Sequence, residues 1–155
     1  MKRLLTAACT ALALAAALPA DAQDKAKGTA AEAIAMVHKA IAHIKKAGRD
    51  KAFADFNNKQ GAFTDRDLYV VVYDMKGKVL SHGANEKMIG KDVIELRDND
   101  GKYFVKERVE MMSKGPDAKG WQDYKFMNPV TRQIEPKSMY LQRYEDMIVG
   151  TGIYK

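Results

Sequence analysis

The segment LYVVVYDMKGKVLSH, at residues 68–82, decides the fold class of this chain. Its first six residues are β-branched, aromatic or leucine side chains, which suit a buried strand. The tetrapeptide DMKG then offers a turn, because Gly77 can adopt positive φ without steric cost. A second apolar stretch returns at residues 78–82. The segment therefore predicts a β-hairpin, and with it an antiparallel sheet.

Beyond the hairpin the sequence shows loop, helix and strand signals in turn. Residues 83–95 are expected to form a loop or an irregular helix. A helix is expected from about 102 to 114, where Gly115 and Pro116 would end it. Three more strands are expected, at residues 120–126, 137–144 and 147–154.

Before the hairpin the sequence predicts two helices. Thr29-Ala-Ala-Glu32 is a capping box, in which each side chain can satisfy a free amide of the other residue. Apolar residues then recur at spacings of three, four and three, on one helical face: Ile34, Val37, Ile41 and Ile44. Gly48 suits the end of this long helix, and Asp50 can cap a second, shorter one.

This order of elements predicts an α+β fold with an antiparallel sheet of about five strands. A sheet this small cannot bury its inner face alone. The long first helix is therefore expected to pack on part of the sheet.

The first 22 residues look like a secretory signal peptide. Lys2 and Arg3 precede an apolar run from Leu4 to Leu18, and Ala20-Asp21-Ala22 offers the small residues of a cleavage site. We expect cleavage after Ala22, a mature single domain at 23–155 and a periplasmic location. An uncleaved anchor helix is the alternative, and lipidation of Cys9 is a more remote one.

Composition excludes several classes of function for the mature chain. It contains no cysteine, which excludes disulfides, thiol nucleophiles, cysteine-ligated zinc, iron–sulfur clusters and c-type haem. The net charge of the whole chain is +6, but the basic residues are scattered, so nucleic acid is not an expected partner. The longest apolar run after residue 22 is 68–73, against about 20 residues for a membrane-spanning helix.

Two acidic or titratable positions invite a chemical interpretation. The run Asp98-Asn-Asp-Gly-Lys resembles part of a calcium loop, although Leu96 would fall at the first ligand position. Asp98 or Asp100 can instead cap the following helix, or Asp98 can contact a ligand. His82 has no nucleophile motif around it, so no catalytic residue, metal or cofactor is expected.

The second half of the chain interleaves aromatic residues with cations. On adjacent strands such residues could enclose a cavity, where a lysine pairs with a carboxylate and tyrosine hydroxyls orient it. The alternative, which the pattern alone favours, is an aromatic sheet core with solvated cations at its ends. Side chains alternate along a strand, so Tyr124 and Phe126 share a face. Lys137 and Tyr140 do not, unless Lys137 precedes the regular strand.

The order and spacing of several short motifs resemble those of the single Cache domain, type 2. The motifs are Tyr69 with DMKG, Leu80-Ser-His82, Ile89-Gly-Lys-Asp92, Asp98-Asn-Asp-Gly101, Gly120-Trp-Gln-Asp-Tyr124, Asn128-Pro129, Pro136-Lys137 with Tyr140, and Val149-Gly-Thr-Gly-Ile-Tyr154. The resemblance covers residues 53–155. It implies a PAS-like Cache fold, with a long N-terminal helix packed on a five-stranded antiparallel sheet.

The resemblance also implies a function. Such domains are extracytoplasmic sensors for small ligands, often acetate, propionate or pyruvate. The ligand-binding candidates carried over by position are Tyr69, His82, Asp98, Tyr124, Phe126, Lys137 and Tyr140. The chain departs from the usual pattern at Gly83, Phe126 and Asp146-Met147, which bears on ligand identity more than on fold.

The expected function is therefore that of an exported, non-enzymatic sensor module that binds a short carboxylate. It would present the bound acid to a signalling or transport partner, such as a membrane receptor or a sensor kinase. No transmembrane helix or signalling domain follows Lys155, so a free-standing form is expected. The alternative is a structural or interaction protein of the same fold with no functional pocket.

Overall fold

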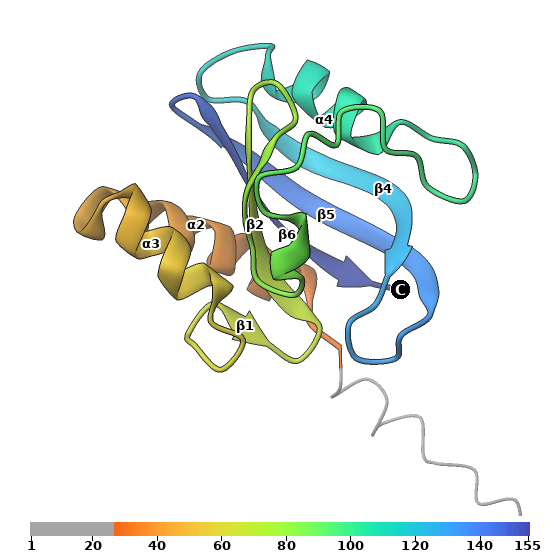
Figure 1. Cartoon of the computed structure of the whole chain (residues 1–155), viewed down its shortest axis with the longest axis horizontal. Coiled ribbons are helices and arrows are strands. Elements are labelled where there is room, and N and C mark those ends of the chain that lie inside the picture. The colour runs from red at the N-terminus through yellow and green to blue at the C-terminus, as the bar shows by residue number, and fades with distance from the viewer. Residues whose placement is uncertain (1–26) are drawn as a thin grey trace, which may run out of the picture.

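The fold is built on one antiparallel sheet of six strands (Figure 1). A computed structural model describes residues 27–155, so the leader and its expected cleavage site lie outside the described residues. The strands are β1 (Thr64–Asp65), β2 (Leu68–Asp74), β3 (Val79–His82), β4 (Lys119–Met127), β5 (Ile134–Tyr144) and β6 (Met147–Tyr154). Their order is β1-β2-β6-β5-β4, and β3 also pairs with β2. The five predicted strands are confirmed; β1 is too short to leave a pattern in the sequence.

The predicted hairpin joins β2 and β3. Gly77 adopts a φ of 90° in its turn. The Asp74 carboxylate accepts hydrogen bonds from the backbone amides of Lys76 and Lys78, at 2.8 and 2.9 Å. These bonds satisfy turn amides that the strand ladder cannot reach, so the turn is fixed locally.

Two helices cover one face of the sheet. In α2 (Ala30–Ala47) the predicted capping box is present, and the buried residues form one stripe. This stripe packs against β6, β5 and β2. A turn at Gly48, with a φ of 80°, leads into α3 (Arg49–Asn57). Gly48 is also the N-cap of α3, so the expectation that Asp50 caps this helix is wrong; Asp50 lies in its first turn.

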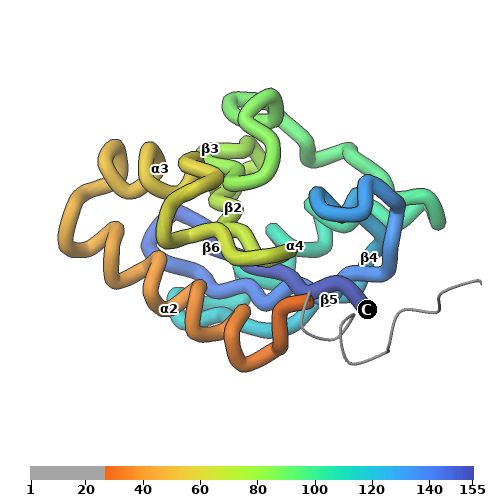
Figure 2. Tube along the Cα trace, turned by 90° about the horizontal axis from the view of Figure 1, so that it is seen from below, coloured from red at the N-terminus to blue at the C-terminus, as the bar shows by residue number. Residues whose placement is uncertain are grey.

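The opposite face is covered by α4 (Phe104–Met112) and by the segment at 83–103, which includes the short helix η1 (Glu86–Met88). Figure 2 shows α2 along one side of β5 and β6 and the 83–103 segment on the other. Each face therefore has its own apolar cluster. The described residues contain no helix long and apolar enough to cross a bilayer.

Candidate functional site

The centre of the α4-covered face holds a buried ammonium group. Lys137 projects from β5 and is 1% exposed. Its Nζ donates hydrogen bonds to the hydroxyls of Tyr69 and Tyr154, at 2.8 and 3.1 Å. No carboxylate in residues 27–155 forms an ion pair with it. Burial, and then the field of Arg108, hold the pKa of Lys137 well below its ordinary value of 10.5.

Gly152 in the neighbouring strand makes room for this side chain, and Gly150 makes room for Leu141 beside it. A Cβ atom at Gly152 would lie 2.3 Å from Cε of Lys137, and one at Gly150 would lie 2.8 Å from Cδ2 of Leu141. Both distances are far below a carbon–carbon contact. The lysine stem therefore lies across the bare backbone of β6 and brings Nζ to Tyr69 on β2.

His82 stands beside this group as a neutral hydrogen-bond donor. Its ring stacks on Tyr69, with centroids 5.2 Å apart. Its Nδ1 accepts from the amides of Ala84 and Asn85, at 3.3 and 3.0 Å, which places the proton on Nε2. Burial, followed by the charge of Lys137, lowers the pKa of His82 to about 3. The imidazole is therefore uncharged at neutral pH, and Nε2–H remains free to donate.

A small pocket opens where these groups meet the ends of β3 and β4. Its volume is about 210 Å³, and its lining residues are Tyr69, His82, Ala84, Asn85, Phe126, Met127 and Pro129. Lys137 stands one side chain behind this wall, with Nζ 4.2 Å from the ring centroid of Tyr69 and 5.8 Å from that of Phe126. The pocket thus has an aromatic wall, two polar side chains and a cation behind them.

A second buried cation lies deeper on the same face. Arg108 of α4 is fully buried, and its Nε and Nη2 donate to Oε1 of Gln122 at 3.2 and 3.1 Å. Its guanidinium carbon lies 4.9 Å from the ring centroid of Tyr73 and 5.2 Å from that of Tyr124. Its Nη1 has no hydrogen-bond partner among the described residues.

The structure brings together four of the seven predicted site residues: Tyr69, His82, Phe126 and Lys137. Tyr124 lies next to them, because it pairs with Lys137 in the sheet, and its hydroxyl contacts the sulfur of Met139 at 3.7 Å. Tyr140 lies on the other face, where its ring meets His38 of α2 edge-on at 6.3 Å. Lys137 is inside β5, so the alternation of strand side chains separates it from Tyr140.

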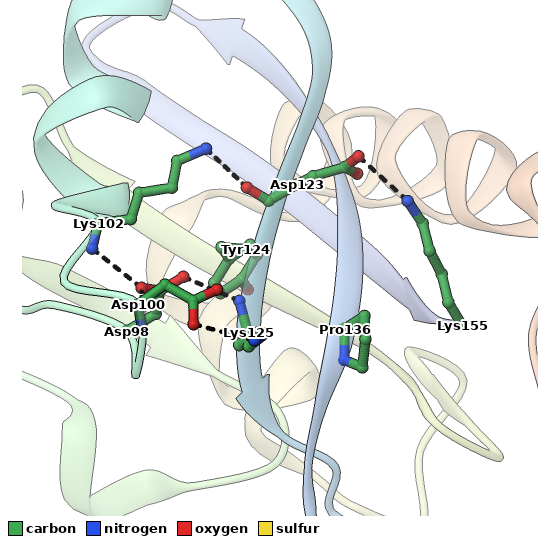
Figure 3. A pocket seen from close by; sticks show the side chains of 8 residues that line it. All are labelled: Asp98, Asp100, Lys102, Asp123, Tyr124, Lys125, Pro136 and Lys155. Atoms are coloured by element: carbon green, nitrogen blue, oxygen red, sulfur yellow. Dashed lines mark hydrogen bonds and ion pairs between the residues drawn. The ribbon is translucent and has the colours of Figure 1, made fainter.

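Asp98 is also apart from the cluster, at the outer edge of β4 (Figure 3). Its Oδ1 accepts from the amides of Asp100 and Lys102, and its Oδ2 accepts from the amide of Lys125. It closes a turn and ties that turn to the edge strand. The expectation that Asp98 or Asp100 caps α4 is wrong, because the N-cap is Tyr103, without a side-chain cap.

The surface around Asp98 forms the larger pocket, of about 290 Å³. Figure 3 shows acidic and basic side chains alternating around it, and they pair among themselves, as Lys125 does with Asp100 at 2.9 Å and Lys155 with Asp123 at 3.1 Å. The three aspartates and three lysines that line this pocket balance in charge, so it has no net charge to attract an acid. In residues 27–155 no group of three or more metal-ligating side chains is placed to hold an ion.

Sequence reasoning missed three residues that shape the site. The Tyr154 hydroxyl, like that of Tyr69, accepts a hydrogen bond from Lys137 Nζ. Asn57 Oδ1 accepts a hydrogen bond from the backbone amide of His82 at 3.0 Å. The third is Arg108, because no local pattern in the sequence shows what a buried guanidinium faces. Tyr154 could have been found from the strand alternation that it shares with Gly152 and Gly150.

Residues 7–155 match the sequence profile of the family described as Single Cache domain 2. The chain is 30% identical over 92 residues to the methyl-accepting chemotaxis protein McpP of Pseudomonas putida, covering 58% of this chain and 16% of that protein. It is 30% identical over 91 residues to the sensor histidine kinase MctS of Rhizobium johnstonii, covering 57% and 19%. The matched regions thus span less than a fifth of either relative.

Solved structures show the same fold. A methyl-accepting chemotaxis protein from Vibrio parahaemolyticus superposes with a TM-score of 0.69 at 22% identity, covering 87% of this chain and 90% of that one. A Cache chemosensory domain described in terms of carboxylic acid recognition superposes at 0.67 with 19% identity, covering 87% and 96%. With its profile match and its fold in agreement, this chain belongs to the single Cache domain 2 family.

Proposed function

We propose that this protein is an exported sensor module that binds a short carboxylate at the pocket formed by Tyr69, His82 and Phe126. Cache sensor domains are ligand-binding signalling domains, and this chain has their fold. The observation that carries the proposal is the buried ammonium of Lys137, which has two tyrosine hydroxyls as partners and no carboxylate. An anion in the adjacent pocket would supply the missing charge.

The energetics of the buried ammonium favour a negatively charged ligand. Removing an ammonium from water without a counter-ion costs several kcal/mol. An arriving carboxylate recovers part of that cost, and the dry aromatic wall strengthens the attraction by lowering the local dielectric constant. The Tyr69 hydroxyl and His82 Nε2–H would donate to the carboxylate directly, and Lys137 would act through the Tyr69 hydroxyl that it contacts at 2.8 Å.

The size of the pocket limits the ligand. Drug-sized ligands occupy pockets of about 300–1,000 Å³, and this one measures about 210 Å³. Acids of a few carbons, such as acetate, propionate or pyruvate, fit that volume. The printed description of one structural neighbour concerns carboxylic acid recognition, which supports the same ligand class here.

The partner and location follow from the relatives as proposals. McpP is a chemotaxis protein and MctS a sensor kinase, so the bound form would act on a membrane receptor, a sensor kinase or a transport partner. The leader at residues 1–22, cleaved after Ala22, would deliver the protein to the periplasm.

Calorimetric titration of the purified protein with acetate, propionate, pyruvate and butyrate tests the proposal. We expect at least one acid to bind, and Lys137→Met to weaken that binding. Lys106→Met is the matched control, because Lys106 is exposed on α4 and should leave affinity unchanged. If no acid binds, and none raises the melting temperature, the alternative of an interaction protein without a functional pocket is favoured.

A further inference from the structure

The guanidinium of Arg108 is buried on the α4-covered face, and the proposed monocarboxylate does not use its hydrogen-bond donors. It is fully buried, its Nε and Nη2 donate to Oε1 of Gln122, and the side chains of Tyr73 and Tyr124 lie against it. The other end of that amide is fixed, because Gln122 Nε2 donates to the carbonyl of Phe104 at 2.8 Å. The amide therefore sets the orientation of the guanidinium and leaves both N–H groups of Nη1 unpartnered.

Nearby carboxylates do not neutralise Arg108. Glu107 is on the same helix, but it is half exposed and pairs with Lys102 at 3.0 Å. Asp67 is buried, but its Oδ1 accepts from the amide of Gly28 at 2.6 Å, and it forms no ion pair with Arg108. A buried arginine that is left with an unpaired donor is costly, so a missing acceptor is the simplest account of its position.

Arg108 and the pocket share a wall of three rings. Phe126 lines the pocket, and its ring centroid lies 5.8 Å from that of Tyr124 and 5.9 Å from that of Phe104. The same two rings lie 5.2 and 5.4 Å from the guanidinium carbon of Arg108. Tyr124 also pairs directly with Lys137 across the β4–β5 ladder. One layer of side chains thus separates the two cations.

We propose that Arg108 Nη1 binds a second carboxylate of the ligand, so that the pocket selects a short dicarboxylate over a monocarboxylate of equal length. This inference rests on the proposed function, since the first carboxylate occupies the place beside Tyr69 and His82. To reach Arg108, the ligand turns aside the half-buried ring of Phe126 and the Tyr124 ring behind it. Side-chain changes of this kind are common on binding. The two carboxylates then satisfy two separate sets of donors that one carboxylate cannot reach together.

Calorimetric titration with succinate and butyrate, which have the same number of carbons, tests the inference. A hydrogen bond to a charged partner corresponds to a roughly tenfold to hundredfold change in affinity, so succinate should bind at least about tenfold more tightly than butyrate. Arg108→Met keeps the apolar stem and should abolish that preference. Butyrate affinity should not fall, because burial still lowers the pKa of Lys137 but the field of Arg108 no longer adds to it. Lys137→Met should weaken both acids.

A second variant keeps the test independent of the folding of Arg108→Met. Gln122→Glu supplies an internal carboxylate at the atom that Arg108 already contacts, so it should also remove the succinate preference and preserve butyrate binding. Equal affinity of the wild-type protein for succinate and butyrate would overturn the inference and leave the proposed function standing. Failure of every acid to bind would overturn both.

Discussion

Replacing Gly152 with alanine tests how the site is built without removing any of its polar groups. The new Cβ atom would lie 2.3 Å from Cε of Lys137 and 3.2 Å from its Cδ and Cγ. Carbon atoms in contact sit at about 3.5–4.0 Å, so the lysine stem must move by more than about 1 Å. A shift of that size lengthens the 2.8 and 3.1 Å bonds to the two tyrosine hydroxyls beyond hydrogen-bonding range.

The expected cost has two parts. Overpacking a buried site destabilises a protein by about 1–3 kcal/mol, and the restriction of the unfolded chain by alanine returns about 0.4–1 kcal/mol. We therefore expect Gly152→Ala to lower the free energy of unfolding by about 1–2 kcal/mol. Carboxylate affinity should fall about tenfold or more, because the ammonium no longer supports the Tyr69 hydroxyl.

Urea denaturation and calorimetric titration measure the two effects. Gly115→Ala is the matched control: its φ is not positive, and nothing lies within 4 Å of its added Cβ atom. It should be neutral or slightly stabilising and should leave affinity unchanged. If Gly152→Ala matched Gly115→Ala in both measurements, the lysine stem would not lie over β6, and the reasoning about the site would fail.

Three further results are expected. Lys137→Met should raise the free energy of unfolding at neutral pH by about 1–3 kcal/mol, because the gain from removing a desolvated ammonium exceeds the loss of two hydrogen bonds. Lower stability in urea melts would mean that its hydrogen bonds offset the cost of burying the ammonium. Carboxylate affinity should fall as pH rises. The pKa of Lys137 is lowered in the free protein, and a bound anion favours the protonated form, so Lys137 loses its proton at a lower pH in the free protein than in the complex. A flat calorimetric profile between pH 6 and 9 would contradict this. Tyr140→Phe and Asp98→Asn should leave affinity unchanged, because both residues lie outside the cluster, and a loss of binding in either would reopen its role.

The fold could be predicted from the sequence because the patterns that indicate it are local. The β2–β3 hairpin, the capping box at Thr29 and the spacing of apolar residues in α2 each depend on neighbours within a few positions. The sequence alone could also indicate that Tyr140 lies outside the site, since the alternation of side chains along a strand puts it on the face opposite Lys137. The position of Asp98 could not, because it depends on the amide of Lys125, which is 27 residues away in sequence. The use of Arg108 is a long-range property of the same kind.

Packing alone does not explain the polar features of the α4-covered face. A methionine at position 137 would fill the space of the lysine stem. A leucine or methionine at 108 would meet the rings that Arg108 contacts, Tyr73, Phe104 and Tyr124, without an unpaired donor. Glycine inside a strand is itself unfavourable by about 0.5–1 kcal/mol relative to alanine, yet Gly152 lies in β6 where the lysine crosses it. Lys137 and Arg108 each weaken the empty fold, Gly152 is needed to seat the lysine, and on the proposed function the two cations become favourable when an anion reaches the pocket. A site that is costly when empty and satisfied when occupied couples ligand binding directly to the stability of this face, which a sensor domain can use to report its ligand.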